Sequence, residues 1–147
     1  MIEWTSKTFH QLTTDELYEI LQLRSAVFVV EQHCYYLDLD DKDKTAYHLL
    51  GKQDNSLIAY SRILPPGLSY PQPSIGRVVL KQTARAKGLG KTLMLKSIQM
   101  VYESYGVQAI KISAQLYLQN FYATLGFSTC SAIYDDAGID HVEMMKP

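Results

Sequence analysis

The stretch that decides the fold reads Val78-Val79-Leu80, then Lys81-Gln82-Thr83-Ala84, and then Arg85-Ala86-Lys87-Gly88-Leu89-Gly90. It places a glycine loop between a β-rich run and a long helical pattern. The first turn of a helix presents backbone N–H groups without internal partners at the positive end of its dipole, so it binds phosphate readily. Gly88 and Gly90 let the backbone approach an anion, and Arg85, Lys87 and Lys91 can supply countercharge. The stretch therefore predicts a phosphate-binding loop.

Two nucleotide-binding motifs do not fit this loop. The dinucleotide pattern G-x-G-x-x-G requires a third glycine where this chain has Leu93. Gly90-Lys91-Thr92 matches the last three letters of a P-loop, but the first glycine of that pattern falls on Arg85. The next expected strand, residues 109–114, does not end in a magnesium-binding acid. The mismatches disfavour both a dinucleotide and a nucleoside triphosphate.

The rest of the chain predicts one domain, residues 1–147, with an α+β (α/β layered) fold. Apolar spacing predicts a helix from Leu89 to Tyr105, which Gly106 ends. Residues 13–16, Thr-Thr-Asp-Glu, have the pattern of a capping box and predict a first helix that ends near Phe28. A mixed, mostly antiparallel central sheet flanked by these helices is expected. Its strands are expected at 4–9, 48–52, 57–62, 74–80, 109–114, 130–134 and 141–145, with a short helix at 118–125.

The composition is that of an ordinary globular domain. Lys plus Arg is 14 and Asp plus Glu is 15, so the net charge is −1 and gives no general attraction to nucleic acid or an anionic membrane. Cys34 and Cys130 form no CxxC pair, so no structural zinc site is expected. They are interpreted as two buried free thiols, although spacing alone also allows a disulfide. The sequence has neither a signal-peptide pattern nor a run of ~20 apolar residues, so a cytoplasmic location is expected.

The loop has a second motif downstream, and together they resemble a known family. Arg-x-x-Gly-x-Gly at 85–90 resembles the acetyl-CoA pyrophosphate loop of the GNAT N-acetyltransferase superfamily, [QR]-x-x-G-x-[GA]. Residues 122–127, Tyr-Ala-Thr-Leu-Gly-Phe, match the family's later Tyr-x-x-x-Gly-Phe. The wider sequence resembles the ElaA-like branch over nearly the whole chain. The matching residues are Leu23, Arg24, 27–32, Tyr36, Asp38, Asp41, His48, 118–119, 121–122, 126–127 and 138–141.

The chain departs from these patterns at three positions. Gln115 stands where GNAT enzymes often have Asn, seven residues before Tyr122. Tyr35 and Asp140 stand where the ElaA-like pattern often has proline. The first departure concerns the contact with the pantetheine arm, and the other two concern the acceptor side.

The resemblance implies a GNAT-like acyl-CoA N-acyltransferase fold and direct transfer of an acetyl group from acetyl-CoA to an amine, without an acyl-enzyme. The amine belongs to a small molecule or a protein. Tyr122 is then the acid that protonates the departing thiolate, because a tyrosine with its ordinary pKa of ~10 is protonated at neutral pH. Backbone groups at Val78 and Leu80 would hold the pantetheine arm and polarise the thioester carbonyl. The implied acetyl-CoA-binding residues are Val78, Val79, Leu80, Arg85, Ala86, Lys87, Gly88, Leu89, Gly90, Lys91, Gln115 and Tyr122.

The acceptor half of the reaction stays open at this point. Glu31, His48 and His141 are the candidate general bases, and removal of the proton through water is an equal alternative. The acidic stretch 38–43 lacks the ligand spacing of a calcium loop, and no metal is expected. It is interpreted either as a solvated loop or as an acidic lip that attracts a cationic amine. The alternative function is a non-catalytic acyl-CoA sensor that has kept the loop. The oligomeric state is open, a homodimer included.

Overall fold

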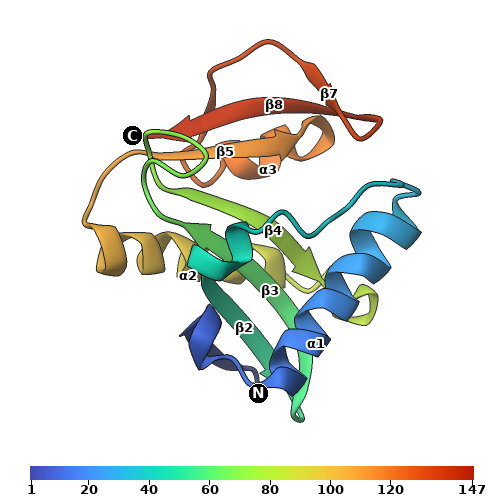
Figure 1. Ribbon diagram of the computed structural model, residues 1–147. Coiled ribbons are helices and arrows are strands. Elements are labelled where there is room, and N and C mark those ends of the chain that lie inside the picture. Colours follow the sequence, from blue (N-terminus) through green and yellow to red (C-terminus); the bar gives the residue numbers. More distant parts are fainter.

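The computed structural model describes residues 1–147 and contains one sheet of eight strands, shown in Figure 1. The strand order is β1-β2-β3-β4-β5-β8-β6, with β7 paired to β8, and only β4 and β5 run parallel. The mixed, mostly antiparallel sheet predicted from the sequence is therefore confirmed. The strands are β1 (Glu3–Thr8), β2 (Tyr47–Gln53), β3 (Ser56–Leu64), β4 (Ser74–Leu80), β5 (Ile110–Gln115), β6 (Ser128–Thr129), β7 (Tyr134–Asp136) and β8 (Ile139–Lys146).

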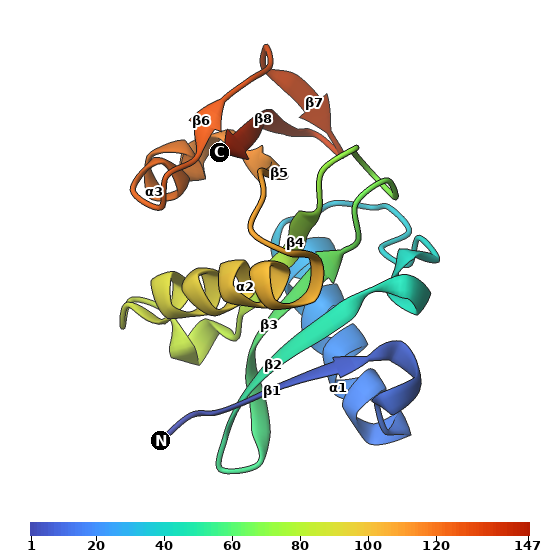
Figure 2. The same ribbon diagram turned by 90° about the vertical axis from the view of Figure 1, so that its left-hand side faces the viewer.

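Two helices cover opposite faces of the β1–β4 half, as Figures 1 and 2 show. Helix α1 (Thr14–Arg24) begins with the predicted capping box, in which the Thr13 hydroxyl accepts from the Glu16 N–H. Helix α2 (Leu89–Tyr105) ends at Gly106 as predicted. A short helix, α3 (Gln119–Ala123), packs with the β5–β8 half. Short turns of 3-10 helix are η1 (Phe9–Gln11), η3 (Lys42–Thr45), η4 (Gln82–Ala84) and η5 (Leu116–Leu118).

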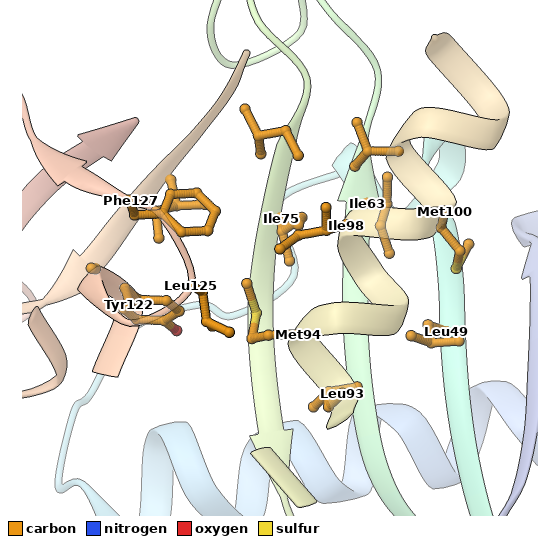
Figure 3. Packing of buried hydrophobic residues seen from close by; sticks show 14 of the residues in the cluster. Leu49, Ile63, Ile75, Leu93, Met94, Ile98, Met100, Tyr122, Leu125 and Phe127 are labelled. Carbon is orange, nitrogen blue, oxygen red and sulfur yellow. The ribbon is translucent and has the colours of Figure 1, made fainter. Parts of the chain in front are cut away.

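The larger hydrophobic core lies on the α2 side of the sheet and joins both halves of the molecule. In Figure 3 the side chains of Tyr122, Leu125 and Phe127 point toward Ile75 on β4 and Met94 on α2. A smaller core on the other face is formed by residues of α1 and the sheet, Ile20 and Tyr60 among them. Alternate residues of the strands fill the two cores because successive side chains of a strand point to opposite faces. The motif at residues 122–127 is thereby packed against β4, the strand that precedes the glycine loop.

The structure corrects two boundaries of the predicted elements. The first helix is α-helical only to Arg24 and continues as a π-helical segment, η2 (Ser25–Glu31), so helical structure extends three residues beyond the predicted end near Phe28. Most of the predicted strand 130–134 is not a strand: residues 130–133 connect β6, which ends at Thr129, to β7, which begins at Tyr134. The Cys130 N–H donates to the Glu143 carbonyl of β8 at 2.8 Å, but the Glu143 N–H donates to the Ser131 hydroxyl, so a side chain replaces one bond of the backbone ladder there.

Three further sequence expectations have outcomes in the structure. Both cysteines are free, but only Cys34 is buried; Cys130 is exposed, because it lies between β6 and β7 rather than in a strand of the core. None of the helices combines the length and the apolar character that crossing a bilayer requires. The β7–β8 hairpin turns at Ala137-Gly138, both with positive φ (53° and 84°), a tighter turn than the predicted 135–138.

Candidate active site

The cleft of this protein lies where β4 and β5 part. The two strands are paired only at Ser74 and Lys111, and Figure 1 shows β5 and β8 diverging from β4 beyond that point. The space between them is a cleft of about 770 Å³. Its walls come from β4, β5, five residues of the glycine loop and helix start (85, 86, 88, 90 and 91), helix α3, the β7–β8 hairpin, and the segment 32–41, called here the connecting segment. Of the predicted loop residues, Lys87 is exposed outside the lining and the Leu89 side chain packs in the core. Because β4 has no strand partner on this side, its peptide groups are free to bind a ligand.

A β-bulge shapes the β4 wall. Tyr60 faces Val79 and Arg62 faces Gly76, so Ser61 of β3 opposes two residues, Arg77 and Val78. Arg77 has a φ of 49°, a left-handed conformation that a non-glycine residue adopts only when its surroundings hold it. Its guanidinium lies 2.8 Å from Asp38 in the connecting segment. The bulge thus redirects β4 toward the cleft after the point where the strands part.

The glycine loop has the backbone geometry of an anion site. Ala86 and Gly88 have positive φ values of 63° and 73°, and α2 begins at Leu89. Gly88 is the N-cap residue, and no side chain caps the helix, so its first N–H groups face the cleft without an internal partner. A Cβ atom at Gly88 would meet nothing within 4 Å, which leaves room for a ligand. Lys91 in the first turn adds a positive charge with no carboxylate within 4.0 Å. These residues fit a diphosphate.

Arg85 ties this loop to the first helical segment. Its guanidinium donates to both carboxylate oxygens of Glu31, at 2.7 and 3.1 Å, and to the Leu80 carbonyl at the end of β4. The structure therefore brings the candidate base Glu31 into the cleft, but at the phosphate-loop end. Both oxygens of its carboxylate are already engaged by the paired hydrogen bond from Arg85.

Tyr122 lines the cleft from α3. It is only 7% exposed, and its ring packs edge-to-face against Phe127. Burial, with a smaller contribution from Tyr117, raises the pKa of Tyr122 to about 12. A phenol with this pKa stays protonated at neutral pH, so it acts as a hydrogen-bond donor and acid rather than as a base.

His141 and Gln115 face each other across the β5–β8 pairing and both line the cleft. The Nδ1 of His141 lies 2.7 Å from the Ile139 carbonyl. A carbonyl only accepts, so Nδ1 carries the proton and Nε2 of the neutral ring keeps its lone pair. The ring is stacked on Tyr134 with centroids 5.9 Å apart. Gln115 donates to the Gln32 side chain in the connecting segment at 3.2 Å. His141 is thus a held imidazole with one basic nitrogen available.

His48 lies outside the cleft. It is fully buried, and its Nε2–H donates to the Asp43 carbonyl at 2.9 Å, while Nδ1 accepts from the Tyr60 hydroxyl at 2.6 Å. Both nitrogens are occupied, and burial lowers the pKa of His48 from its ordinary value of 6.5. Of the three candidate bases, the structure brings Glu31 and His141 to the cleft and keeps His48 in the interior.

This burial makes a prediction for stability. Since the pKa of His48 is lower in the folded state, the unfolded chain binds the proton more readily, and the contribution of His48 is present above pH 6.5 and lost below it. We expect the free energy of unfolding to fall by up to about 1.4 kcal/mol per pH unit between pH 6.5 and 5. Urea unfolding at pH 7.5, 6.5 and 5.5 measures it.

The matched variant is His48→Gln, because a glutamine amide can donate to one partner and accept from the other without titrating. Its stability should change much less over the same pH range. The carboxylates Glu16 and Asp40, whose pKa values lie at about 2, lose their contributions only at lower pH. An equal slope in the variant would show that His48 is not the titrating group.

The acidic stretch is neither a solvated loop nor a free acidic lip. Asp38, Asp40 and Asp43 alternate with three arginines from three elements in a network that reaches the cleft wall. The ion pairs are Arg24–Asp38 (2.7 Å), Arg24–Asp43 (2.7 Å), Arg62–Asp40 (2.7 Å), Arg62–Asp43 (3.1 Å), Arg77–Asp38 (2.8 Å) and Arg77–Asp40 (3.4 Å). Burial opposes the ionisation of Asp40, but the hydrogen bond from Arg62 and the nearby arginine charges outweigh it and lower its pKa to about 2. Both sequence interpretations were therefore wrong for these three residues.

Several cleft residues had no signal in the sequence. Lys42 in η3, Ser69 in the loop before β4 and Ser113 in β5 belong to no motif, and only the folded chain brings them to the cleft. Arg62 and Arg77 stood in the sequence as ordinary strand residues. No group of three or more His, Cys, Asp or Glu side chains is arranged to hold a metal ion.

Comparison with known proteins identifies the family to which a chain with this fold and cleft belongs. The family profile described as "Acetyltransferase (GNAT) domain" matches residues 10–147, and the chain belongs to this family. ElaA of Escherichia coli is 38% identical over 148 residues, which cover 99% of this chain and 97% of ElaA. A UPF0039 protein of Synechocystis is 41% identical over 145 residues, which cover 98% and 94%.

Solved structures agree with this assignment. An acyl-CoA N-acyltransferase from Pseudomonas aeruginosa superposes with a TM-score of 0.96 at 38% identity, and E. coli ElaA with 0.94 at 37%; both alignments cover 100% of each chain. The resemblance to the ElaA-like branch, the GNAT fold and the expectation of an acyltransferase are thereby confirmed. An acyl-CoA is the co-substrate that this family implies.

Proposed function

We propose that this chain is an acetyl-CoA-dependent N-acetyltransferase, a single domain of 147 residues that transfers the acetyl group directly to an amine. The observation that carries the proposal is one continuous cleft, lined at once by the glycine loop of α2, the unpaired edge of β4, Tyr122 and His141. Each part corresponds to one requirement of the reaction: anion binding, thioester alignment, an acid and a base.

The donor half is assigned to the glycine loop and β4. The first N–H groups of α2 and the Lys91 ammonium would bind the diphosphate of acetyl-CoA. The peptide groups of β4 at Val78 and Leu80 would bond to the pantetheine arm as a neighbouring strand does. A peptide N–H of β4 directed at the thioester carbonyl would stabilise the negative charge that grows on its oxygen. Gln115, which stands in place of the frequent Asn, supplies a carboxamide on the opposite wall.

The proton transfers are assigned to His141 and Tyr122. The amine must lose a proton to attack, and Nε2 of His141, directly or through water, accepts it. The amine nitrogen of the acceptor attacks the carbonyl carbon of the thioester. The C–S bond then breaks, and the CoA thiolate takes the proton of the Tyr122 hydroxyl. No acyl-enzyme is needed. The buried Cys34 thiol, which donates to the Gln32 carbonyl at 3.5 Å, has no imidazole or carboxylate partner that would make it a nucleophile. Two free thiols fit a reducing cytoplasm.

The direct test is the release of free CoA from acetyl-CoA across a panel of amines. We expect release that depends on both the amine and the enzyme, together with an acetylated product detected by mass spectrometry. The non-catalytic sensor is the competing outcome. It would bind acetyl-CoA tightly and release no CoA with any member of a broad panel.

The loop assignment makes a separate binding prediction. Gly88→Glu should weaken acetyl-CoA binding by at least about 100-fold, or about 2.7 kcal/mol, because a carboxylate would stand against the diphosphate. Isothermal titration calorimetry measures the affinity. Gly106→Glu is the matched control: it lies at the other end of α2, also has a positive φ (88°), and a Cβ there also meets nothing within 4 Å.

Both variants should lose stability, since a non-glycine residue is strained at positive φ. Only Gly88→Glu should lose affinity. If the Gly88→Glu protein binds acetyl-CoA as the wild type does, the phosphate site is not at this loop.

A further inference from the structure

The cleft lining contains one positively charged side chain, Lys42, for which neither the protein nor the acyl-CoA supplies an anionic partner. Positively charged side chains of the lining are Lys42, Arg62, Arg77, Arg85 and Lys91. The three arginines are held by carboxylates at 2.7–3.4 Å. Lys42 and Lys91 have no carboxylate within 4.0 Å. A cation in a cleft without a counterion indicates a site for an anionic group of a ligand.

The two unpaired lysines serve different ends of the cleft. Lys91 follows the glycine loop, beyond the Leu80 end of β4. Lys42 is in η3, and its ammonium donates to the Ser69 hydroxyl at 2.8 Å, in the loop that leads into the Ser74 end of β4. Six residue steps of β4 separate these ends by about 20 Å. A diphosphate bound at Lys91 would therefore lie too far away to contact Lys42 as well.

The position and the free hydrogen-bond donors of Lys42 suit an anionic group of a ligand. Its side chain is half-buried, and its backbone N–H donates to Asp40 at 3.1 Å, which fixes the turn. Only one of its three ammonium protons is used by Ser69, so two donors remain for a ligand. Asp40 does not neutralise it, because Arg62 holds both oxygens of that carboxylate at 2.7 and 2.9 Å. The network of three arginines and three aspartates is balanced in charge, so the ammonium of Lys42 is in excess.

One carboxylate of the lining is also without a cation. Asp136, at the tip of the β7–β8 hairpin, has no cationic side chain within 4.0 Å. It lies on the strand pair that carries His141. The cleft lining thus presents a negative charge on the hairpin that carries His141 and a positive charge on η3. An amine that also carries a carboxylate complements both.

We propose that the acceptor is an amine that bears a carboxylate, of the amino-acid class, and that Lys42 and the Ser69 hydroxyl bind that carboxylate. The inference rests on the proposed function only in naming the acceptor of the same site. It replaces one of the two sequence interpretations of the acidic stretch, the acidic lip that attracts a cationic amine. The arginines already occupy those acids, and the cation left over selects an anion.

The test is calorimetric binding to protein saturated with CoA, so that it does not depend on turnover. The probes are two pairs of amines that differ only by the carboxylate: L-phenylalanine with phenethylamine, and L-lysine with cadaverine. We expect the carboxylate-bearing member to bind about 10–100-fold more tightly, the range of a charged hydrogen bond worth about 1.5–3 kcal/mol. Lys42→Met should abolish that ratio, while the binding of phenethylamine and cadaverine stays unchanged.

The matched control is Lys44→Met, two residues along the same turn, where the side chain is 65% exposed and outside the cleft. It should keep the wild-type ratio. The inference is overturned if neither amino acid binds, if both members of a pair bind equally, or if Lys42→Met retains the preference. None of these outcomes bears on CoA release, so the proposed N-acetyltransferase activity stands or fails in the amine-panel assay alone.

Discussion

Replacing Tyr122 by phenylalanine is expected to lower kcat by about 10²–10⁴-fold, the usual contribution of a positioned general acid. The change removes one hydroxyl and keeps the ring that packs against Phe127, so the core should be preserved. With burial holding its pKa at about 12, Tyr122 is fully protonated in any practical assay, and the variant's loss should be independent of pH up to about 10. Steady-state kinetics with acetyl-CoA measures the effect, and KM for acetyl-CoA should change little.

Tyr105→Phe is the matched control for this experiment. Burial also raises the pKa of Tyr105, and its ring packs on Tyr47, but it lies at the end of α2 outside the cleft. We expect that variant to keep the wild-type kcat. If Tyr122→Phe turns over as fast as the wild type, the thiolate obtains its proton elsewhere and Tyr122 is a core residue only.

Loss of Arg24 is expected to cost about 3–5 kcal/mol of folding free energy, the range found when one partner of a buried ion pair is removed. Arg24 is fully buried and donates to Asp38 and Asp43 at 2.7 Å each. Arg24→Leu keeps much of the volume but leaves two buried carboxylates short of a cation. For a domain of this size the melting temperature should fall by about 10–15 °C. Thermal and urea unfolding at pH 7.5 measure both quantities.

The control is again an ion pair of the same stretch. Lys44 and Asp41 are 3.3 Å apart but largely exposed, and such pairs contribute about 0–1 kcal/mol. Lys44→Leu should therefore leave the stability nearly unchanged. A loss below about 1 kcal/mol in Arg24→Leu, within the range of an exposed pair, would mean that the network adds little to stability.

The sequence predicts those parts of the site whose structure is determined by residues close together in the chain. The glycine loop follows from residues 88 and 90 and the apolar spacing of one helix, and Tyr122 from its spacing to Gly126-Phe127. These features need no knowledge of distant contacts, because helix starts and short motifs are determined by neighbours in the chain.

The rest depends on contacts between distant residues. Arg77 and Asp38 are 39 positions apart, and neither strand spacing nor composition indicates that they meet. His48 and His141 had equal standing as candidate bases, and only burial and hydrogen bonds separate them. In the same way, four aspartates within six residues indicate an acidic surface until the arginines of other elements are placed beside three of them.

In the connecting segment, aspartates paired with arginines alternate with exposed side chains. This alternation has a consequence for how the preference for an acceptor can diversify among related proteins. Asp38 and Asp40 are tied to arginines, whereas their neighbours Leu37 and Tyr35 are 80% and 91% exposed. Asp38 and Asp40 are therefore constrained by their ion pairs, since an exchange that removes one charge leaves the partner unmatched. The exposed neighbours can vary freely at almost no cost in folding. Mutational drift, natural or directed, can thus rewrite the rim of the acceptor cleft while the strand that aligns the donor stays in register.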